Sequence, residues 1–200
     1  MWKYFAKRNA RKLKHFFEAL LHTKRVPAPY LQKHALLLDF FPAESTVVET
    51  GTYLGETTEL LRGHCRKVVS IEPYDPLYEY NARRFEPFKN VTVVHGSSEQ
   101  CFEGVVENLT GDISFWLDGH YSGDGTHGSL DTASPIMREL EVIGNWLASN
   151  DGGVYVAIDD ARLFLGRDGY PEKTQIYDFA LNNALVCLEF RDIFFLKKAV

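Results

Sequence analysis

Short runs rich in β-branched and aromatic residues alternate with longer stretches of helical pattern from Thr46 onward, and this alternation constrains the fold more than any other feature. Five such runs precede the tail: "TVVET", "KVVSIE", "VTVVHG", "DISFWLD" and "GVYVAIDD". Strands that alternate with helices are joined by crossover connections, which make the strands parallel and place helices on both faces of the sheet. The pattern therefore predicts an α/β fold with a doubly wound sheet.

The boundaries of the expected elements follow from the same pattern. Strands are expected over residues 46–50, 67–72, 91–96, 112–118 and 153–160, and helices over residues 56–62, 77–85, 98–109 and 135–148. In the tail, "ALVCLEFRD" and "IFFLKKAV" adjoin with little room for a helix, so they are expected to form an antiparallel pair at one edge. The full prediction is a mostly parallel, seven-stranded, Rossmann-like sheet with an antiparallel last strand.

The chain is expected to consist of an N-terminal helical extension, residues 1–42, and a main α/β domain, residues 43–200. Residues 2–22 have the pattern of an amphipathic helix, and residues 30–41 that of a second, short helix. The first helix carries these apolar residues on one side: Trp2, Phe5, Ala6, Leu13, Phe16, Phe17, Leu20 and Leu21. That face would dock on the main domain or on a second subunit, which would make a homodimer; the alternative is an anionic membrane surface or an acidic partner.

Charge is unevenly distributed along the chain. Residues 1–25 hold eight of the 22 Lys and Arg residues but one of the 27 acidic residues, which leaves 14 basic and 26 acidic residues in the rest. An acidic domain with a basic arm argues against general binding of nucleic acid by the main domain.

Cysteine usage and hydropathy indicate the compartment. Three widely spaced cysteines without a CxxC pair suit neither a metal site nor a disulfide framework. No apolar run approaches the roughly 18–20 residues that a transmembrane helix requires. Glu18 and His22 interrupt what would be the apolar core of a signal peptide. We therefore expect a cytoplasmic protein without a transmembrane segment.

Ligands of doubly wound sheets bind at the carboxyl ends of the strands, so the residues that end each strand are the candidate site residues. The first strand ends in "ETGTYLGETT", where Glu49, Gly51 and Gly55 form ExGxxxG rather than the dinucleotide motif GxGxxG. The glycines allow a tight turn and close approach of a ligand. Glu49 would repel a pyrophosphate but could hold a cationic ligand.

The next two strand ends also carry polar residues. Glu72 follows Glu49 by 23 residues, and a carboxylate at that position can accept hydrogen bonds from both hydroxyls of a ribose. In "HGSSE", Ser97, Ser98 and backbone groups could bind an adenine edge. Each residue alone would more simply be a polar cap or loop residue; together, at three consecutive strand ends, they favour a nucleoside-containing ligand.

The segments "VVETGTYLGETTELL", "VSIEP", "VVHGSSE", "FWLDGH" and "VAIDDAR" resemble successive motifs of class I S-adenosylmethionine (SAM)-dependent methyltransferases, over about residues 45–197. The resemblance implies that SAM is the cofactor. It implies contacts to the methionine moiety from Glu49, Gly51 and Gly55, to the ribose from Glu72, and to the adenine from the Ser97–Ser98 region. It also places Tyr53, Thr57 and Asp118 at the cofactor. SAM carries a sulfonium and an ammonium but no phosphate, which agrees with an acidic Glu49.

Within that class the chain is similar to metal-dependent O-methyltransferases of the catechol and macrolide-sugar kinds. The resemblance implies that Asp118, Asp159 and Asp160 converge at the ends of two neighbouring strands and bind Mg²⁺. Oxygen ligands suit Mg²⁺, which would bind substrate oxygens and lower the pKa of the acceptor hydroxyl. The alternative is that Asp118 caps a loop while Asp159 or Asp160 pairs with Arg162, whose guanidinium would replace the metal.

The loop after Asp118 departs from the catechol-type pattern, because Gly119, His120 and Tyr121 stand where those enzymes carry a catalytic Lys. His120 is the candidate general base, since an imidazole titrates near neutral pH, and Tyr121 could orient the substrate. The glycine-rich segment up to Ser134 is long enough to be a lid.

A second loop, "LFLGRDGYPEKTQ", is expected at the same edge of the sheet. It places four polar side chains there: Arg162, Arg167, Asp168 and Tyr170. These could recognise an anionic or sugar-like substrate, or form a solvated connection.

The sequence thus predicts a methyltransferase that modifies a hydroxyl of a small molecule, such as a sugar, polyol or phenol, assisted by Mg²⁺ if the metal site forms. A first alternative is an NAD(P)-dependent oxidoreductase, which Glu72 fits but the absence of GxGxxG and the presence of Glu49 oppose. A second is a non-catalytic binding protein with the same fold. Methylation of protein or nucleic acid is disfavoured, because the sequence has neither an NPPY-type tetrad nor a basic main domain.

Overall fold

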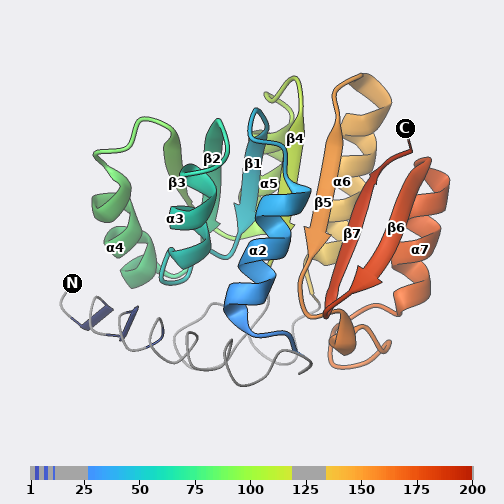
Figure 1. Cartoon of the computed structure of the whole chain (residues 1–200), viewed down its shortest axis with the longest axis horizontal. Helices are drawn as coiled ribbons and strands as arrows, with labels where there is room; N and C mark the ends of the chain where they lie inside the picture. Colours follow the sequence, from blue (N-terminus) through green and yellow to red (C-terminus); the bar gives the residue numbers. More distant parts are fainter. Residues whose placement is uncertain (1–2, 5–6, 9–10, 12–26, 119–133, 200) are drawn as a thin grey trace.

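A mixed seven-stranded sheet forms the centre of the molecule (Figure 1). The computed structural model describes residues 27–118 and 134–199, together with Lys3, Tyr4, Lys7, Arg8 and Arg11. The strands are β1 (Thr46–Thr50), β2 (Lys67–Glu72), β3 (Val91–His95), β4 (Ile113–Leu117), β5 (Val154–Ile158), β6 (Leu185–Phe190) and β7 (Ile193–Lys198).

The strand order is β3-β2-β1-β4-β5-β7-β6. Successive strands are therefore added on one side of β1 up to β3 and on the other side from β4 onward, so the switch point lies between β1 and β4. Strands β1 to β5 are parallel to their neighbours, whereas β7 is antiparallel to both β5 and β6. The predicted fold class, including the antiparallel last strand and the closing pair at one edge, is confirmed.

Helices cover both faces of the sheet. They are α2 (Tyr30–Phe40), α3 (Glu56–Arg62), α4 (Asp75–Phe85), α5 (Ser98–Val106), α6 (Ile136–Ser149) and α7 (Lys173–Asn182), with a short 3-10 helix η1 (Ala161–Leu163) after β5. Figure 1 shows α2 and α3 in front of the sheet and α5 and α6 behind it. Because both faces are covered, every residue of β1 and β4 is buried.

Alternate residues of the strands supply two separate cores. Val48 of β1 packs in the larger cluster with Phe102 of α5 and Ile143 of α6. Val47, its neighbour, faces the other side and packs with Leu37 of α2 and Leu61 of α3. This alternation is the period of two expected for a strand, and it places Glu49 on the same face as Val47.

The tail contains a helix that the sequence did not predict. Helix α7 begins in the last three residues of the segment interpreted as a loop and continues through residues for which no element was predicted. Its first turn is closed by a capping box between Glu172 and Gln175. Along α7 only Ile176 and Ala180 are fully buried, so the apolar stripe that would identify the helix is short. The predicted helix over 98–109 is also shorter, because α5 ends at Val106.

The second helix of the N-terminal extension is confirmed as α2, whereas most of residues 2–22 lie outside the described residues. The described ones lie against the main domain: the ring of Tyr4 is 5.5 Å from that of Tyr80, and Arg11 Nε is 3.5 Å from Glu56 Oε2. A homodimer through this helix stays a prediction. No helix in the described part of the chain is long and apolar enough to cross a membrane.

We expect Gly55→Ala to destabilise the fold by at least about 2 kcal/mol. Gly55 has φ +67°, and a Cβ there would lie 2.5 Å from Asn81 Oδ1 and 2.8 Å from the Phe85 ring. The control is Gly104→Ala, where no atom lies within 4 Å of the added Cβ. That change lies inside α5 and should stabilise by about 0.5–1 kcal/mol. Urea unfolding of both variants measures the difference; equal stabilities would contradict the packing described for the turn after β1.

Candidate functional site

The carboxyl ends of β1, β2, β4 and β5 meet at one edge of the sheet and carry four acidic residues. Glu49 and Glu72 lie within β1 and β2, and Asp118 and Asp159 follow β4 and β5 directly. The N–H of Asp118 donates to Thr50 O (3.2 Å), and that of Asp159 to Leu117 O (3.1 Å), so the strand ladder extends to both residues. The structure therefore brings together the strand-end carboxylates that the sequence singled out.

Glu49 is buried, and only one of its two carboxylate oxygens accepts hydrogen bonds from the described residues. Oε2 accepts hydrogen bonds from Thr58 Oγ1 (2.5 Å) and Ser70 Oγ (2.6 Å). Oε1 has no hydrogen-bond partner among the residues that the structure describes. Burial raises the pKa of Glu49 to about 7. A buried acid with an open oxygen is suited to a ligand that brings a positive charge or a hydrogen-bond donor.

Glu72 holds the loops after β1 and β2 in place. Its carboxylate accepts the backbone N–H of Tyr53 (2.7 Å) and of Tyr74 (3.0 Å). Burial raises the pKa of Glu72, and these two backbone donors lower it. A carboxylate has about four acceptor positions, so lone pairs are left for hydroxyl donors of a ligand.

The turn after β1 depends on unusual backbone angles. Gly51 has φ +87°, Gly55 has φ +67°, and Tyr53 between them has φ +49°. A non-glycine residue in this region is uncommon and is held here by the bond from Tyr53 N to Glu72. The hydroxyl of Thr57, in α3, forms hydrogen bonds with Tyr30 OH (2.8 Å) and His34 Nε2 (3.3 Å), both in α2. Thr57 thus connects the start of α3, which follows the turn after β1, to α2.

Ser97 and Ser98 begin α5 next to the end of β3. Ser97 forms a capping box with Gln100, which accounts for the hydroxyl of Ser97 without a ligand. Ser98 is buried and lies close to Glu139, in the first turn of α6.

Glu139 is a buried acid that the sequence analysis did not select. It is 2% exposed, and neither of its carboxylate oxygens accepts a hydrogen bond that satisfies normal geometry from the described residues. Burial raises its pKa to about 7, and the nearby hydroxyls of Ser98 and Thr50 lower it. A glutamate in a helix is usually exposed, so the sequence would predict a surface position for Glu139. Only knowledge of which face of α6 is buried could have identified it.

The predicted metal ligands are only partly grouped as expected. Carboxylate oxygens of Asp159, Asp160 and Asp192 lie within 4.8 Å of one another, and we call these three residues the acidic cluster. Asp118 is not part of it. Burial raises the pKa of Asp118 well above its usual range, and the charges of Asp159 and Asp160 raise it further. Asp192, from the turn between β6 and β7, has no sequence signal beyond its place next to a strand.

Two side-chain cations occupy the acidic cluster. Lys33 Nζ, from α2, forms an ion pair with Asp159 Oδ1 and lies 3.3 Å from Asp160 Oδ1 and 3.9 Å from Asp192 Oδ2. Arg162 NH1 lies 2.7 Å from Asp160 Oδ1 and also pairs with Asp192. The alternative in which Arg162 pairs with an acid of this group is therefore the one observed. Oxygens that already pair with an ammonium and a guanidinium are poorly placed to bind a divalent metal.

The remaining candidates fall into two groups. His120 and Tyr121 lie outside the described residues, as does the predicted lid up to residue 133. In the second loop, Tyr170 is partly buried against Phe164, and its pKa is raised to about 12 by burial and by nearby acids, of which Asp160 has the largest effect.

Arg167 and Asp168 of the second loop are exposed, with Arg167 Nε 3.8 Å from Asp168 Oδ2. The two therefore form a solvated part of that loop, whereas Arg162 and Tyr170 face the acidic cluster.

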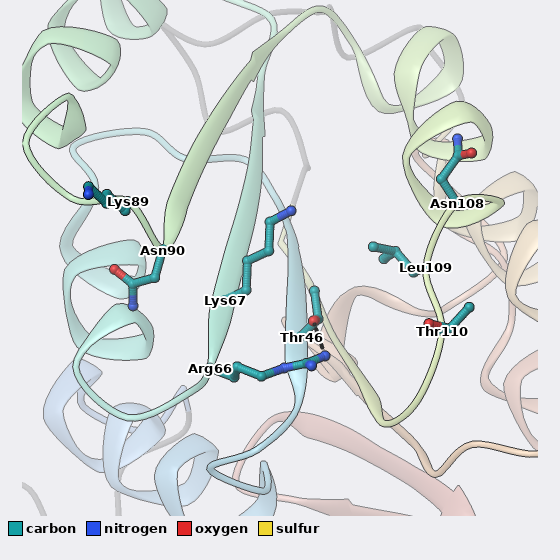
Figure 2. A pocket seen from close by; sticks show the side chains of 8 residues that line it. All are labelled: Thr46, Arg66, Lys67, Lys89, Asn90, Asn108, Leu109 and Thr110. Atoms are coloured by element: carbon teal, nitrogen blue, oxygen red, sulfur yellow. Dashed lines mark hydrogen bonds between the residues drawn. The ribbon is translucent and has the colours of Figure 1, made fainter.

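A separate hollow lies at the opposite edge of the sheet, at the amino ends of β1 and β2 (Figure 2). Its volume is about 440 Å³, and Arg66, Lys67 and Lys89 contribute its positive charge. Figure 2 shows Arg66 reaching Thr46, to which it donates a hydrogen bond of 3.1 Å. Because ligands of such sheets bind at the carboxyl ends, this hollow is distinct from the candidate site.

Comparisons with known proteins identify the fold. No known family model matches the sequence, and no curated protein matches it. The O-methyltransferase TomG from Streptomyces achromogenes, solved in complex with SAM, is 14% identical with a TM-score of 0.59, over 92% of this chain and 94% of TomG.

Two other solved structures are similar to this chain at comparable levels. A putative rRNA methylase from Clostridium thermocellum is 15% identical with a TM-score of 0.56, over 84% of this chain and 96% of that one. The N-methyltransferase NodS from Bradyrhizobium japonicum is 15% identical with a TM-score of 0.51, over 84% and 93%. The chain therefore has the fold that these methyltransferases share.

Proposed function

We propose that this protein is a SAM-dependent methyltransferase that methylates a hydroxyl group of a small molecule. The observation that carries the proposal is that Glu49 Oε1, at the end of β1, is buried and accepts no hydrogen bond from the described residues. It lies next to the turn that contains Gly51 and Gly55. The fold shared with an O-methyltransferase and an N-methyltransferase supports the general activity.

The charge of the site favours SAM over a dinucleotide. SAM presents an ammonium and a sulfonium, whereas a dinucleotide presents a pyrophosphate, which a buried carboxylate would repel. Glu49 would accept the ammonium, Glu72 the ribose hydroxyls, and Ser98 would lie near the adenine. The same charge argument opposes the oxidoreductase alternative.

In the proposed reaction the acceptor oxygen attacks the methyl carbon of SAM while the carbon–sulfur bond breaks. The sulfur keeps the electron pair and leaves as S-adenosylhomocysteine, and the acceptor proton passes to a base. His120 is the proposed base, with Tyr121 orienting the acceptor. Asp118, at the end of β4, is a second candidate proton acceptor in its ionised form. The proposed steps are written without Mg²⁺, because Lys33 and Arg162 already pair with the acids of the acidic cluster.

A small-molecule acceptor is favoured by charge. Beyond residue 25 the chain has 14 basic and 26 acidic residues, which gives little attraction for a phosphate backbone. A cytoplasmic location fits the same reading of the sequence and stays a prediction.

Glu49→Gln should weaken binding of S-adenosylhomocysteine about 10- to 100-fold, because a charge-assisted hydrogen bond to the ammonium is lost. Glutamine keeps the size of the side chain, so Thr58 and Ser70 still have a partner. Glu86→Gln, at an exposed position after α4, is the control and should bind as the wild type does. Calorimetry measures both. Wild-type protein that binds NAD but not S-adenosylhomocysteine would overturn the proposed function.

Binding of S-adenosylhomocysteine should strengthen as the pH rises from about 6 to about 8. The pKa of Glu49 is raised to about 7, so below that pH the free protein must lose a proton before it can pair with a cation. The affinity should change by up to about tenfold per pH unit below pH 7 and level off above it. Glu49→Gln removes the titrating group and should show a flat profile over this range. A flat wild-type profile would show that Glu49 does not contact the ammonium.

His120→Ala should lower the rate of methyl transfer by about 100-fold or more, because a general base contributes roughly that factor. His127→Ala is the matched control, a histidine in the same loop without a proposed role. Single-turnover assays with labelled SAM, applied to a set of sugars, polyols and phenols, measure the rate and identify the acceptor. Equal rates for the two variants would exclude His120 as the base.

A further inference from the structure

We propose that the ammonium group of Lys33 takes the place of a divalent cation in the acidic cluster, so that this protein works without a metal and becomes a metal-binding protein only when Lys33 is removed. The metal-binding part of this inference is independent of the proposed function; the activity part rests on it.

The first support is the geometry of Lys33. Its ammonium contacts three carboxylates, at an ion-pair distance from Asp159 Oδ1, at 3.3 Å from Asp160 Oδ1 and at 3.9 Å from Asp192 Oδ2. The side chain of Lys33 is 9% exposed, and that of Asp192 is fully buried. A buried lysine this close to three acids is a central cation of the group, not a surface ion pair.

The second support is the balance of charge. Three buried or half-buried carboxylates without cations would repel one another strongly. Lys33 and Arg162 supply two positive charges against the three negative ones.

The third support is competition for oxygens. Asp159 Oδ1 accepts from Lys33 and from the N–H of Asp160 (2.8 Å), and Asp160 Oδ1 is shared by Lys33 and Arg162. Mg²⁺ or Mn²⁺ would need oxygens of the same residues at about 2.0–2.2 Å. It would then lie beside a fixed ammonium, and the repulsion disfavours binding as long as Lys33 remains in place.

The fourth support is the anchoring of Lys33. Helix α2 is held on the sheet by the fully buried Leu37 and on α3 by the bonds of Tyr30 and His34 to Thr57. The backbone of Lys33 is therefore held next to the cluster, within reach of the three acids.

The test uses Mn²⁺ as the probe on the full chain, followed by electron paramagnetic resonance and by thermal unfolding. Wild-type protein should not bind Mn²⁺ at micromolar concentration, and its melting temperature should not change with Mn²⁺ or with EDTA. Lys33→Ala should be less stable, should gain Mn²⁺ affinity by at least tenfold, and should regain melting temperature when Mn²⁺ is added. Lys33→Arg, which keeps the charge, should resemble the wild type in Mn²⁺ binding.

The control is Lys67→Ala, at the opposite edge of the sheet (Figure 2), which should not change Mn²⁺ binding. Micromolar Mn²⁺ binding by the wild type, or a folded Lys33→Ala protein with no gain in Mn²⁺ affinity, would overturn the proposal. If Lys33→Ala does not fold, the Mn²⁺ titration of the wild type remains the test, because micromolar binding there would overturn the proposal.

Methyl transfer by the wild type should also be insensitive to EDTA. Loss of activity in EDTA would overturn the activity part. A failure to bind S-adenosylhomocysteine, by contrast, would reject the proposed function and leave the result with Mn²⁺ unaffected.

Discussion

The close approach of buried carboxylates at the carboxyl ends of the strands is the constraint on which the rest of this site depends. A parallel sheet brings the ends of β1, β2, β4 and β5 to one edge, and each end carries an acid. Buried acids are costly unless they are paired or hydrogen-bonded. Glu49 and Glu72 meet this cost through neutral donors and Asp159 through a cation, and the difference divides the edge into the proposed ligand-binding part and a closed part.

On the β1–β2 side the acids are satisfied by neutral donors and keep capacity for a ligand. Hydroxyls of Thr58 and Ser70 serve Glu49, and backbone N–H groups serve Glu72. Neither acid has a cation of the protein in direct contact among the described residues. A cationic cofactor with a ribose would pair with both acids, which is the basis for proposing SAM.

On the β5–β7 side the acids are satisfied by cations of the protein itself. Lys33 and Arg162 connect α2, the end of β5 and the turn between β6 and β7 into one ion-pair network. Removal of one partner from such a network leaves an unbalanced buried charge. The N-terminal extension is therefore a structural part of the site and not an appendage to the sheet.

The sequence alone determined the strands, their order of occurrence and the acids that end them, because hydrophobic periodicity and strand length are local properties. The predicted boundaries of β1 and β2 are those observed. Helix α7 was missed, because Ile176 and Ala180 alone give too short an apolar stripe. Glu139 was also missed, since a glutamate in a helix gives no local sign of burial.

Only the tertiary structure decided which charges meet. Lys33 and Asp159 are 126 residues apart, and nothing in the local pattern of α2 shows that its lysine reaches the end of β5. The motif resemblance to metal-dependent enzymes indicated a group of acids, and Arg162 was weighed as their partner, but Lys33 was not. The balance is a property of three-dimensional distance, since Coulomb interactions depend on separation in space and not along the chain.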